Sequence, residues 1–343
     1  MKKLLIFKTS YWRSKIKTFL IKIFLLDYKL KSLKKNNNNI LIITMDALGD
    51  NIVKNKTIEI LANEFGKENT YILCKSKWEE IYKLQNYKNI FIDETKWNIF
   101  YKIRLYRKLN KIGFSTIAIL NHSHLPIEMD YIIHGNKYDM SEDTSYILEK
   151  HIIILKKILN KSFSIDDIRP NLGKYFLRKK FHDIISIAVA ASNNKRTCTY
   201  NNLKNYIENL LNLKTKHRIY LLGTGEKQRK IAEKLIEDIK SERIINVVDI
   251  VDLKEVIQII NDSDLFIGGD SGLLNIAFSL GKKSICLHWC KDKYIWEHDD
   301  KNIKILKGKG GKEFLDSKYG TDILNSITFE QIKEAIEELE NNK

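Results

Sequence analysis

The sequence GGDSGLLNIAFSLG at residues 268–281 places an aspartate and a serine in a turn that leads from an apolar run into a helix-like stretch. Ser271 is a poor nucleophile candidate, because the hydrolase pattern Gly-x-Ser-x-Gly requires glycine where this chain has Leu273. The turn offers instead the backbone N–H groups of a helix N-terminus, where the helix dipole favours an anion. Ser271 adds a hydroxyl donor, and Asp270 is suited to hold the turn or to accept hydrogen bonds from sugar hydroxyls. This chemistry predicts a ligand that carries both a diphosphate and a sugar.

A second turn, Leu48-Gly49-Asp50, follows the apolar run ILIIT at 40–44. Gly49 permits a tight turn, and Asp50 falls near the first turn of the helix expected next. A carboxylate at this position serves either as a helix cap or as a functional group that faces a ligand. Asp46 is the rival carboxylate nearby.

A third turn follows the apolar run IISIAVA at 184–190. Ala190, Ala191 and Ser192 are small enough to let a ligand approach the backbone. Lys195 then has the reach to meet a phosphate as a point charge. The alternative is a solvated surface lysine, which is common in so lysine-rich a chain.

Short apolar runs alternate with helical patterns after residue 40, which favours parallel sheets of the doubly wound type. Strands are expected at 40–44, 70–74, 89–92, 116–120, 131–133, 184–190, 218–222, 244–248, 264–268 and 284–288. Helices are expected at 52–65, 200–212, 226–239, 252–261, 272–280 and 327–340. The three turns described above therefore follow the carboxyl ends of strands, where sheets of this type bind their ligands.

A basic, irregular stretch around 160–180 separates two sets of strands. We therefore predict two similar α/β domains that face a cleft, with the ligand between them. The predicted parts are a basic segment and linker at 1–36, a first domain at 37–172, a second domain at 173–326 and a C-terminal helix at 327–343.

The net charge of +16 is concentrated at the N-terminus. Residues 1–35 hold eleven lysines or arginines and one acid, a net of +10, so the rest of the chain carries only +6. Apolar residues recur here at spacings of three and four, which places them on one helix face: Trp12, Ile16, Phe19, Ile23, Leu26, Leu30 and Leu33. A basic amphipathic helix of this kind is typical of an anionic membrane surface. The alternatives are packing on the protein's own core and binding to nucleic acid, although an aliphatic face suits nucleic acid poorly.

The sequence also bounds the location of the protein. No stretch approaches the roughly 20 apolar residues that span a bilayer, and no signal peptide is evident. The cysteines lack zinc-site spacing and are expected to be reduced thiols: Cys74, Cys198, Cys286 and Cys290. These features predict a cytoplasmic protein that lies peripherally on the inner face of the cytoplasmic membrane.

The run from Leu253 to Leu287 resembles the heptosyltransferases of glycosyltransferase family 9. In that family a strand leads into Asp-Thr-Gly, two further residues, a histidine and a small-residue helix that ends in Leu-Gly. The sequence ILIITMDALGDNIV at 40–53 resembles the family's first strand with its Leu-Gly-Asp. The sequence AVAASNNKR at 188–196 resembles the turn that carries the family's lysine. The likeness runs in the same order over roughly residues 38–330.

The resemblance implies a GT-B fold, which consists of two Rossmann-like, doubly wound parallel-sheet domains facing a cleft; here they follow the basic amphipathic N-terminal helix. It implies an inverting glycosyltransferase that uses no metal or other cofactor. The expected donor is a nucleotide-sugar, with ADP-heptose favoured. The expected acceptor is the core of a bacterial lipopolysaccharide or a related cell-surface glycolipid.

The resemblance also implies roles for individual residues. By position, Asp50 resembles the catalytic base that deprotonates the acceptor, and Lys195 resembles the residue that stabilises the leaving diphosphate. Gly49 belongs to the acceptor side. The implied donor-binding residues are Ala190, Ala191, Ser192, Glu226, Val251, Asp270, Ser271, Gly272 and Asn275.

Several positions depart from the family pattern. Asn275 stands where the family has histidine, Ser271 replaces threonine and Lys56 replaces proline. The strand SICLHWCKD at 284–292 lacks the family's Phe-Gly-Pro continuation. An asparagine donates to a phosphate but carries no charge. Two other classes therefore stay open: a non-catalytic GT-B protein that binds a sugar nucleotide or acts as a scaffold, and a basic nucleic-acid-binding protein.

Overall fold

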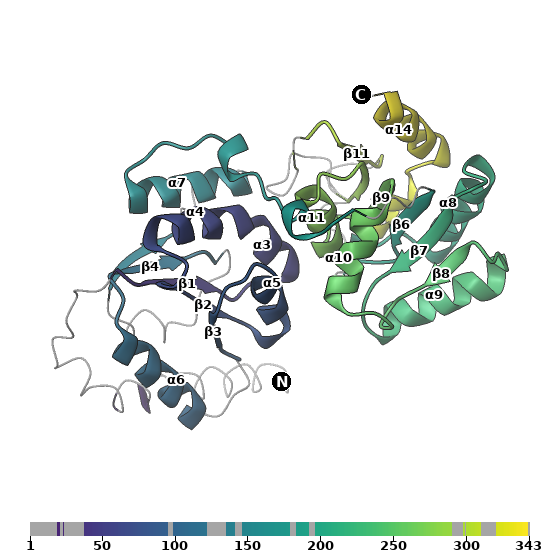
Figure 1. Ribbon diagram of the computed structural model, residues 1–343. Helices are drawn as coiled ribbons and strands as arrows, with labels where there is room; N and C mark the ends of the chain where they lie inside the picture. The colour runs from purple at the N-terminus through teal and green to yellow at the C-terminus, as the bar shows by residue number, and fades with distance from the viewer. Residues whose placement is uncertain are drawn as a thin grey trace, which may run out of the picture. The chain divides into compact units, whose positions relative to one another are not determined.

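The computed structural model of the protein has two compact α/β units, each built on a parallel sheet (Figure 1). It describes residues 19, 20, 23, 38–94, 99–121, 135–140, 146–178, 183–191, 196–289, 298, 300–309 and 320–341, with the backbone alone at 320–322. The first unit comprises residues 1–47, 57–143 and 150–168. The second comprises 48–56, 144–149 and 169–343. The domain boundaries drawn from the sequence stay predictions.

Five parallel strands form the sheet of the first unit, in the order β3-β2-β1-β4-β5. The strands are β1 Ile40–Thr44, β2 Thr70–Cys74, β3 Asn89–Ile92, β4 Thr116–Ile119 and β5 Asn136–Asp139. The central strand β1 is buried along its whole length. Its unbroken apolar sequence is typical of a parallel strand that is covered on both faces.

Helices cover both faces of this first sheet. The helices of this part of the chain are α3 Leu48–Val53, α4 Asn55–Phe65, α5 Glu79–Leu84, α6 Ile99–Ile112 and α7 Ile147–Leu159. Tyr106 and Leu109 of α6 pack in one apolar cluster with Leu41 and Ile43 of β1. Figure 1 shows α4 and α7 on the other side of the sheet from α6.

Six parallel strands form the sheet of the second unit, in the order β11-β10-β9-β6-β7-β8. The strands are β6 Ile184–Ala188, β7 Arg218–Leu222, β8 Ile244–Asn246, β9 Leu265–Gly269, β10 Ser284–His288 and β11 Ile303–Lys307. The helices are α8 Tyr200–Leu213, α9 Glu226–Ile239, α10 Leu253–Asp262, α11 Gly272–Ser279, α13 Gly320–Asn325 and α14 Phe329–Asn341. Local sequence sets some of these bounds: Asp252 and Glu255 form a reciprocal capping box that starts α10.

The sequence pattern predicted the strands at 40–44, 70–74, 89–92, 218–222 and 284–288, and the structure confirms these bounds. Four more predicted strands exist but differ by one or more residues at their ends: those at 116–120, 184–190, 244–248 and 264–268. The run 131–133 lies outside the described residues.

Three features of the fold differ from the prediction or go beyond it. The helix expected at 52–65 is two helices, α3 and α4, which meet at Lys54, and α3 begins at Leu48. Strands β5 and β11 were not predicted. Both are polar edge strands, NKYD and IKILK, which lack the continuous apolar run of a central strand.

The predicted N-terminal helix lies outside the described residues except for Phe19, Leu20 and Ile23, which are helical and exposed. Within the ranges that the structure describes, no helix combines the length and apolar character that crossing a membrane requires.

Candidate functional site

The order of strands in the second sheet reverses between β6 and β9. From β6 the chain adds β7 and β8 on one side, whereas β9 lies on the other side of β6 and is followed by β10 and β11. At such a point the loops that leave two neighbouring strands diverge, and a crevice forms beyond their carboxyl ends. The turn after β6 holds Ala190 and Ala191, and the turn after β9 holds Asp270, Ser271 and Gly272. Topology therefore brings these predicted donor-binding residues to one edge of the sheet.

Glycines at the end of β9 allow the two turns to approach closely. A Cβ on Gly268 would lie 2.8 Å from the Cβ of Ala188, and a Cβ on Gly269 would lie 2.6 Å from the backbone oxygen of Arg196. Both distances are shorter than real contacts allow, so a larger residue would push β6 and the turn after it away from β9.

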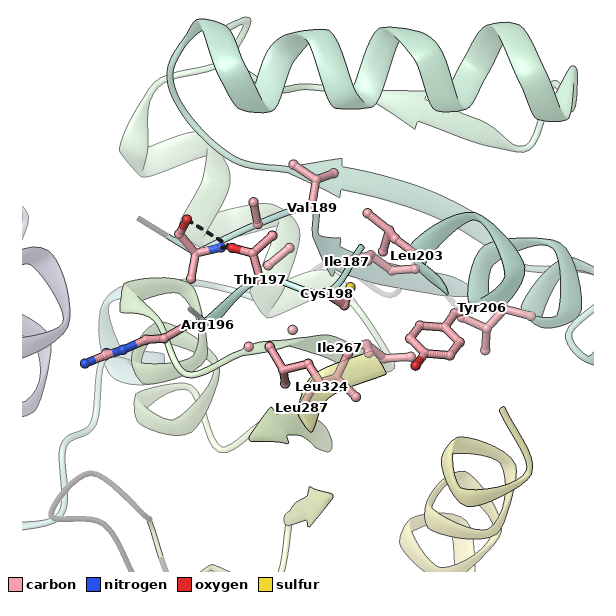
Figure 2. Close-up of a pocket in the computed structure, with 16 residues that line it drawn as sticks. Ile187, Val189, Arg196, Thr197, Cys198, Leu203, Tyr206, Ile267, Leu287 and Leu324 are labelled. Carbon is pink, nitrogen blue, oxygen red and sulfur yellow. Dashed lines mark hydrogen bonds between the residues drawn. The ribbon is translucent and has the colours of Figure 1, made fainter. Parts of the chain in front are cut away.

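Asp270 is buried and paired with a cation from the neighbouring turn. Its Oδ2 lies 3.0 Å from Nη1 of Arg196, without the alignment of a hydrogen bond, so the contact is a pairing of charges. The same guanidinium lies 5.6 Å from the ring centroid of Trp289. Figure 2 shows Arg196 directed away from the apolar side chains of the pocket beside it. Because Arg196 offsets the charge of Asp270, the turn repels an anion less than an isolated carboxylate would.

Ser271 occupies the N-cap position of α11 but does not cap the helix. Its backbone is extended, with φ −155° and ψ 172°, and its side chain accepts no hydrogen bond from the first turn. The Oγ atom is buried and has no hydrogen-bond partner among the described residues. An N-cap serine ordinarily bonds a first-turn N–H. Here the side chain of Ser271 leaves the first-turn N–H groups of α11 uncapped.

Asn275, one turn further along α11, is held at both ends of its amide. Its Nδ2 donates to the backbone oxygen of Ser271 at 3.1 Å, and its Oδ1 lies 2.7 Å from Nε2 of His298. The imidazole of His298 stacks on Phe278 with 3.8 Å between ring centroids and an interplanar angle of 8°. His298 thus fixes the amide of Asn275, and this amide fixes the backbone carbonyl of Ser271.

The hydrogen bonds of His298 assign its tautomer. The amide oxygen of Asn275 only accepts, so Nε2 carries the proton and Nδ1 is the acceptor, 3.4 Å from the hydroxyl of Tyr146. Burial, followed by the charge of Arg169, lowers the pKa of His298 to about 3. The ring is therefore neutral at physiological pH and acts as a fixed hydrogen-bond donor.

Helix α3 packs against α11 within the second unit. A Cβ on Gly49 would lie 2.5 Å from Nδ2 of Asn275, and a Cβ on Gly272 would lie 3.0 Å from the side chain of Leu48. Both glycines are needed for this crossing. Asp50, the predicted base, follows Gly49 in the first turn of α3 and is half-exposed. Helix α3, which carries Asp50, therefore packs on α11, which begins at the predicted donor turn.

Glu226 and Val251 lie on the same edge of the sheet, after β7 and β8. Glu226 begins α9, and its exposed side chain pairs with Lys230 at 2.7 Å. Asp249 fixes the turn before Glu226 by accepting from the backbone nitrogen of Gly225 at 2.8 Å. Val251 is half-exposed. Both residues lie at the carboxyl edge of the sheet, beyond β7 and β8, and so further from the point where the strand order reverses.

A packed apolar floor supports the turn after β6. A cavity of about 20 Å³ lies among Ile187, Val189, Ile267 and other side chains at the ends of β6, β9 and β10 (Figure 2). This volume has room for about one water molecule and none for a nucleotide. Thr197 Oγ1 accepts from the backbone nitrogen of Ala191 at 3.1 Å and donates to its backbone oxygen at 3.5 Å, the contact dashed in Figure 2, and so closes the turn.

Two predicted site residues, Ser192 and Lys195, lie outside the described residues, and their roles stay predictions. Among the cysteines, Cys74, Cys198 and Cys286 are free thiols, and Cys290 lies outside the described residues.

Burial raises the pKa of the Cys74 thiol and the Cys198 thiol to about 12, so neither is a thiolate nucleophile at neutral pH.

The second sheet and its turns carry a recognisable family signature. Residues 178–310 match the family described as glycosyltransferase family 9 (heptosyltransferase). This part of the chain is a glycosyltransferase family 9 domain. No curated protein sequence matches the chain.

Solved structures with the same architecture extend the likeness beyond that domain. The glycosyltransferase family 9 protein from Veillonella parvula has a TM-score of 0.71 at 14% identity, over 88% of this chain and 97% of that one. E. coli heptosyltransferase WaaC with ADP-2-deoxy-2-fluoro heptose has a TM-score of 0.67 at 13% identity, over 88% and 99%. E. coli ADP-heptose lps heptosyltransferase II has a TM-score of 0.68 at 14% identity, over 88% and 98%.

At these identities the likeness establishes the fold. The prediction of two parallel-sheet α/β units of the GT-B type is confirmed. Together with the family 9 domain, the fold identifies a glycosyltransferase.

Sequence reasoning missed two residues that contact the predicted donor turn. Arg196 lies next to the predicted Lys195, but nothing in the local sequence shows that it reaches Asp270. His298 contacts Asn275 across 23 positions, from a segment with no motif. A histidine–asparagine contact of this kind depends on tertiary structure, so the sequence carried no signal for it.

Replacement of His298 should flatten the pH dependence of stability. In the unfolded chain a histidine titrates near pH 6.5. As the pH falls below 6.5, the unfolded chain gains a proton that the folded chain, whose His298 pKa is about 3, does not gain, so stability is lost. Between pH 7 and pH 5 the native protein should lose roughly 2 kcal/mol more free energy of unfolding than His298→Gln. Urea denaturation at both pH values measures the difference.

Tyr146→Phe serves as the control, because it removes only a hydroxyl near the ring and leaves the titrating group in place. It should keep the native pH dependence. If His298→Gln lost stability with acid as steeply as the native protein, the assignment of a buried neutral His298 would be wrong.

Proposed function

We propose that the protein transfers a sugar from a nucleotide-sugar, with ADP-heptose favoured, to the core of a lipopolysaccharide or to a related cell-surface glycolipid. The transfer would proceed with inversion and without a metal ion. The observation that carries the proposal is the buried Ser271 hydroxyl, which has no partner among the described residues, at the N-terminus of α11 where the strand order reverses. A helix N-terminus with a free donor suits the diphosphate of such a donor.

The surroundings of this turn favour a diphosphate joined to a sugar. Arg196 supplies positive charge beside Asp270, and it offsets the repulsion that a carboxylate would exert on phosphate. The Oδ atoms of Asp270 are acceptors for ligand hydroxyls. Lys195, on the same turn as Arg196, is proposed to stabilise the charge that develops on the leaving diphosphate. Glu226 and Val251 would line the nucleoside end.

Asp50 is proposed as the general base. Its carboxylate would remove the proton of the acceptor hydroxyl as that oxygen attacks the anomeric carbon, and the sugar–phosphate bond would break on the opposite side. Support comes from the packing of α3 on α11, which ties Asp50 to the turn proposed to hold the donor. Gly49 allows this approach, since a side chain there would collide with Asn275.

Heptose is favoured because the similar E. coli structures are named as heptosyltransferases, one of them with an ADP-heptose analogue and another as an ADP-heptose enzyme. The specific observation for the second candidate, a GT-B protein that binds a sugar nucleotide without turnover, is Asn275. Its amide is held between Ser271 and His298 and carries no charge for a phosphate.

The protein is also proposed to work at the inner face of the cytoplasmic membrane, held by residues 1–35. The exposed helical residues Phe19 and Ile23, with exposed fractions of 63% and 44%, support an apolar face on this basic segment. A glycolipid acceptor diffuses in the membrane plane, so a peripheral position would raise its local concentration at the site.

A single nucleoside diphosphate should bind at the donor turn. Titration calorimetry with ADP, UDP, GDP and CDP should show binding of one of them, ADP on the favoured assignment. Asp270→Ala should weaken that binding by at least tenfold, because it removes the charge pair that joins the two turns and an acceptor for ligand hydroxyls. Asp238→Asn removes an exposed carboxylate from the last turn of α9, away from the donor turns, and serves as the matched control, with binding unchanged. Failure of all four diphosphates to bind would remove the support for a donor site.

Asp50→Asn should abolish turnover but not donor binding. With the selected nucleotide-sugar and a core-truncated lipopolysaccharide as acceptor, kcat should fall by about 10² to 10⁴, the usual contribution of a general base. The affinity for the nucleoside diphosphate should stay within about twofold, because the base does not touch the diphosphate. Asp46→Asn is the control, since Asp46 is the rival carboxylate. Loss of turnover with Asp46→Asn alone would move the base to that residue.

Removal of residues 1–35 should release the protein from anionic vesicles. In flotation with vesicles that contain an anionic lipid, the full chain should float, whereas a chain that begins at residue 36 should stay in the dense fraction. Full-length Phe19→Ser/Ile23→Ser keeps every charge and should float less, because its apolar contact is lost. Equal flotation of the full and shortened chains would refute this assignment.

A further inference from the structure

A second pocket lies at the opposite edge of the second sheet, at the amino ends of its strands. It has a volume of about 410 Å³. Residues just before or at the start of four strands line it: His217, Asp264, Lys283 and Asn302 precede β7, β9, β10 and β11. The donor turns follow the carboxyl ends of the same strands, so this pocket is separate from the proposed donor site.

The pocket is lined by more positive than negative side chains. Four cations and two carboxylates contribute to its wall: Arg178, Lys214, Lys282, Lys283, Asp264 and Glu340. Each carboxylate already has a cation: Asp264 lies 3.2 Å from Arg178, and Glu340 lies 2.5 Å from Lys214. Among the described residues, Lys282 and Lys283 have no carboxylate within ion-pair distance. The pocket therefore has two positive charges in excess.

Lys282 is the buried member of this pair. Its side chain is only 6% exposed, and its Nζ donates to the backbone oxygen of Asn261 at 2.9 Å. An ammonium group has three N–H donors. Among the described residues the Lys282 ammonium makes that one hydrogen bond, so two of its donors have no assigned partner. Burial, followed by the charge of Arg178, lowers the pKa of Lys282 to about 8, and the carboxylates of Asp264 and Asp262 only partly oppose this shift.

His217 presents a second unsatisfied group. Its Nδ1 is buried with no hydrogen-bond partner among the described residues, and the nearest carboxylate oxygens lie 3.8 Å and 3.9 Å from the ring, on Asp183 and Asp264. Burial lowers the pKa of His217, so the ring is neutral at physiological pH and has one donor nitrogen. A buried polar atom without a partner is costly unless a ligand or water meets it.

We propose that this pocket binds a small anion that carries a phosphate or diphosphate group, through Lys282, Lys283 and His217. The volume fits a phosphorylated small molecule and lies at the lower end of the range for ligand pockets. Ile185, Leu265, Ile336 and Leu339 give the pocket an apolar side, which suits an organic part of the ligand. The bound group is either a free phosphorylated metabolite or a lipid headgroup, which share this chemistry.

Occupancy of the pocket has a structural consequence. Ile336, Leu339 and Glu340 belong to the last turns of α14, while the lysines belong to the loop before β10. An anion between them would tie the C-terminal helix to the sheet. A ligand that binds only the folded state also raises the apparent stability in proportion to the logarithm of its concentration. The proposal goes beyond the proposed transferase function and does not depend on it.

The experiment uses the full chain and two probes. Pyrophosphate in solution, titrated by calorimetry at fixed ionic strength, tests the free-metabolite source. Vesicles that contain phosphatidate test the headgroup source. Lys283→Gln should weaken binding to at least one probe by about tenfold, the usual effect of a lost charge-assisted hydrogen bond. Lys254→Gln, an exposed lysine outside the pocket, removes the same charge and should leave binding unchanged.

Two further measurements keep the outcome decisive. Lys282→Met removes the buried charge and should weaken binding of the same probe that Lys283→Gln weakens. If Lys282→Met fails to fold, binding by Lys283→Gln and by Arg178→Gln, at a partly exposed residue, decides the test. Stabilisation by pyrophosphate should also persist when ADP saturates the donor turn, which separates the two sites. Equal binding by the native protein, Lys283→Gln and Lys254→Gln for both probes would overturn the proposal, as would no binding of either probe to the native protein.

Discussion

The reversal of strand order between β6 and β9 is the constraint on which the proposed donor site depends. These strands pair in parallel, Ile185 opposite Leu265, although they lie far apart in the sequence. Their carboxyl ends therefore coincide, and the turn that holds Arg196 meets the turn that holds Asp270. Glycine at 268 and 269 is part of the same constraint, because the turns meet at distances that leave no room for a Cβ.

The two polar side chains at the N-terminus of α11, Ser271 and Asn275, differ in their hydrogen bonds. Ser271 does not cap the helix, whereas Asn275 is fully engaged with the carbonyl of Ser271 and with His298. Among the described residues the serine hydroxyl has no hydrogen-bond partner, whereas the asparagine holds the carbonyl of the turn. A neutral, buried His298 suits this role, since a charged ring would carry a desolvation cost in the same place. Helix α3 packs on the same asparagine through Gly49.

The two edges of the second sheet obtain positive charge from different sources. At the carboxyl edge, positive charge comes from Arg196 and from the dipole of α11, and a carboxylate is already paired. At the amino edge, strand starts offer no helix N-terminus, and positive charge comes from lysines, one of them buried. Net charge alone revealed neither arrangement, because most of the sequence excess lies in residues 1–35.

The sequence by itself determined the repeating strand–helix pattern, since apolar runs such as ILIIT and RIYLL are too short for helices and alternate with longer helical patterns. It also determined the turn that carries Asp270, because glycine marks the strand end, whereas the turn predicted at Leu48-Gly49-Asp50 is the first turn of α3. It did not determine β5, β11 or the break at Lys54, where polar residues leave no periodic signal. Only the tertiary structure decided the contacts of Arg196, His298 and Lys282. Each of these side chains acquires its partner from residues brought near by the sheet order, and burial lowers the pKa of His298 and of Lys282.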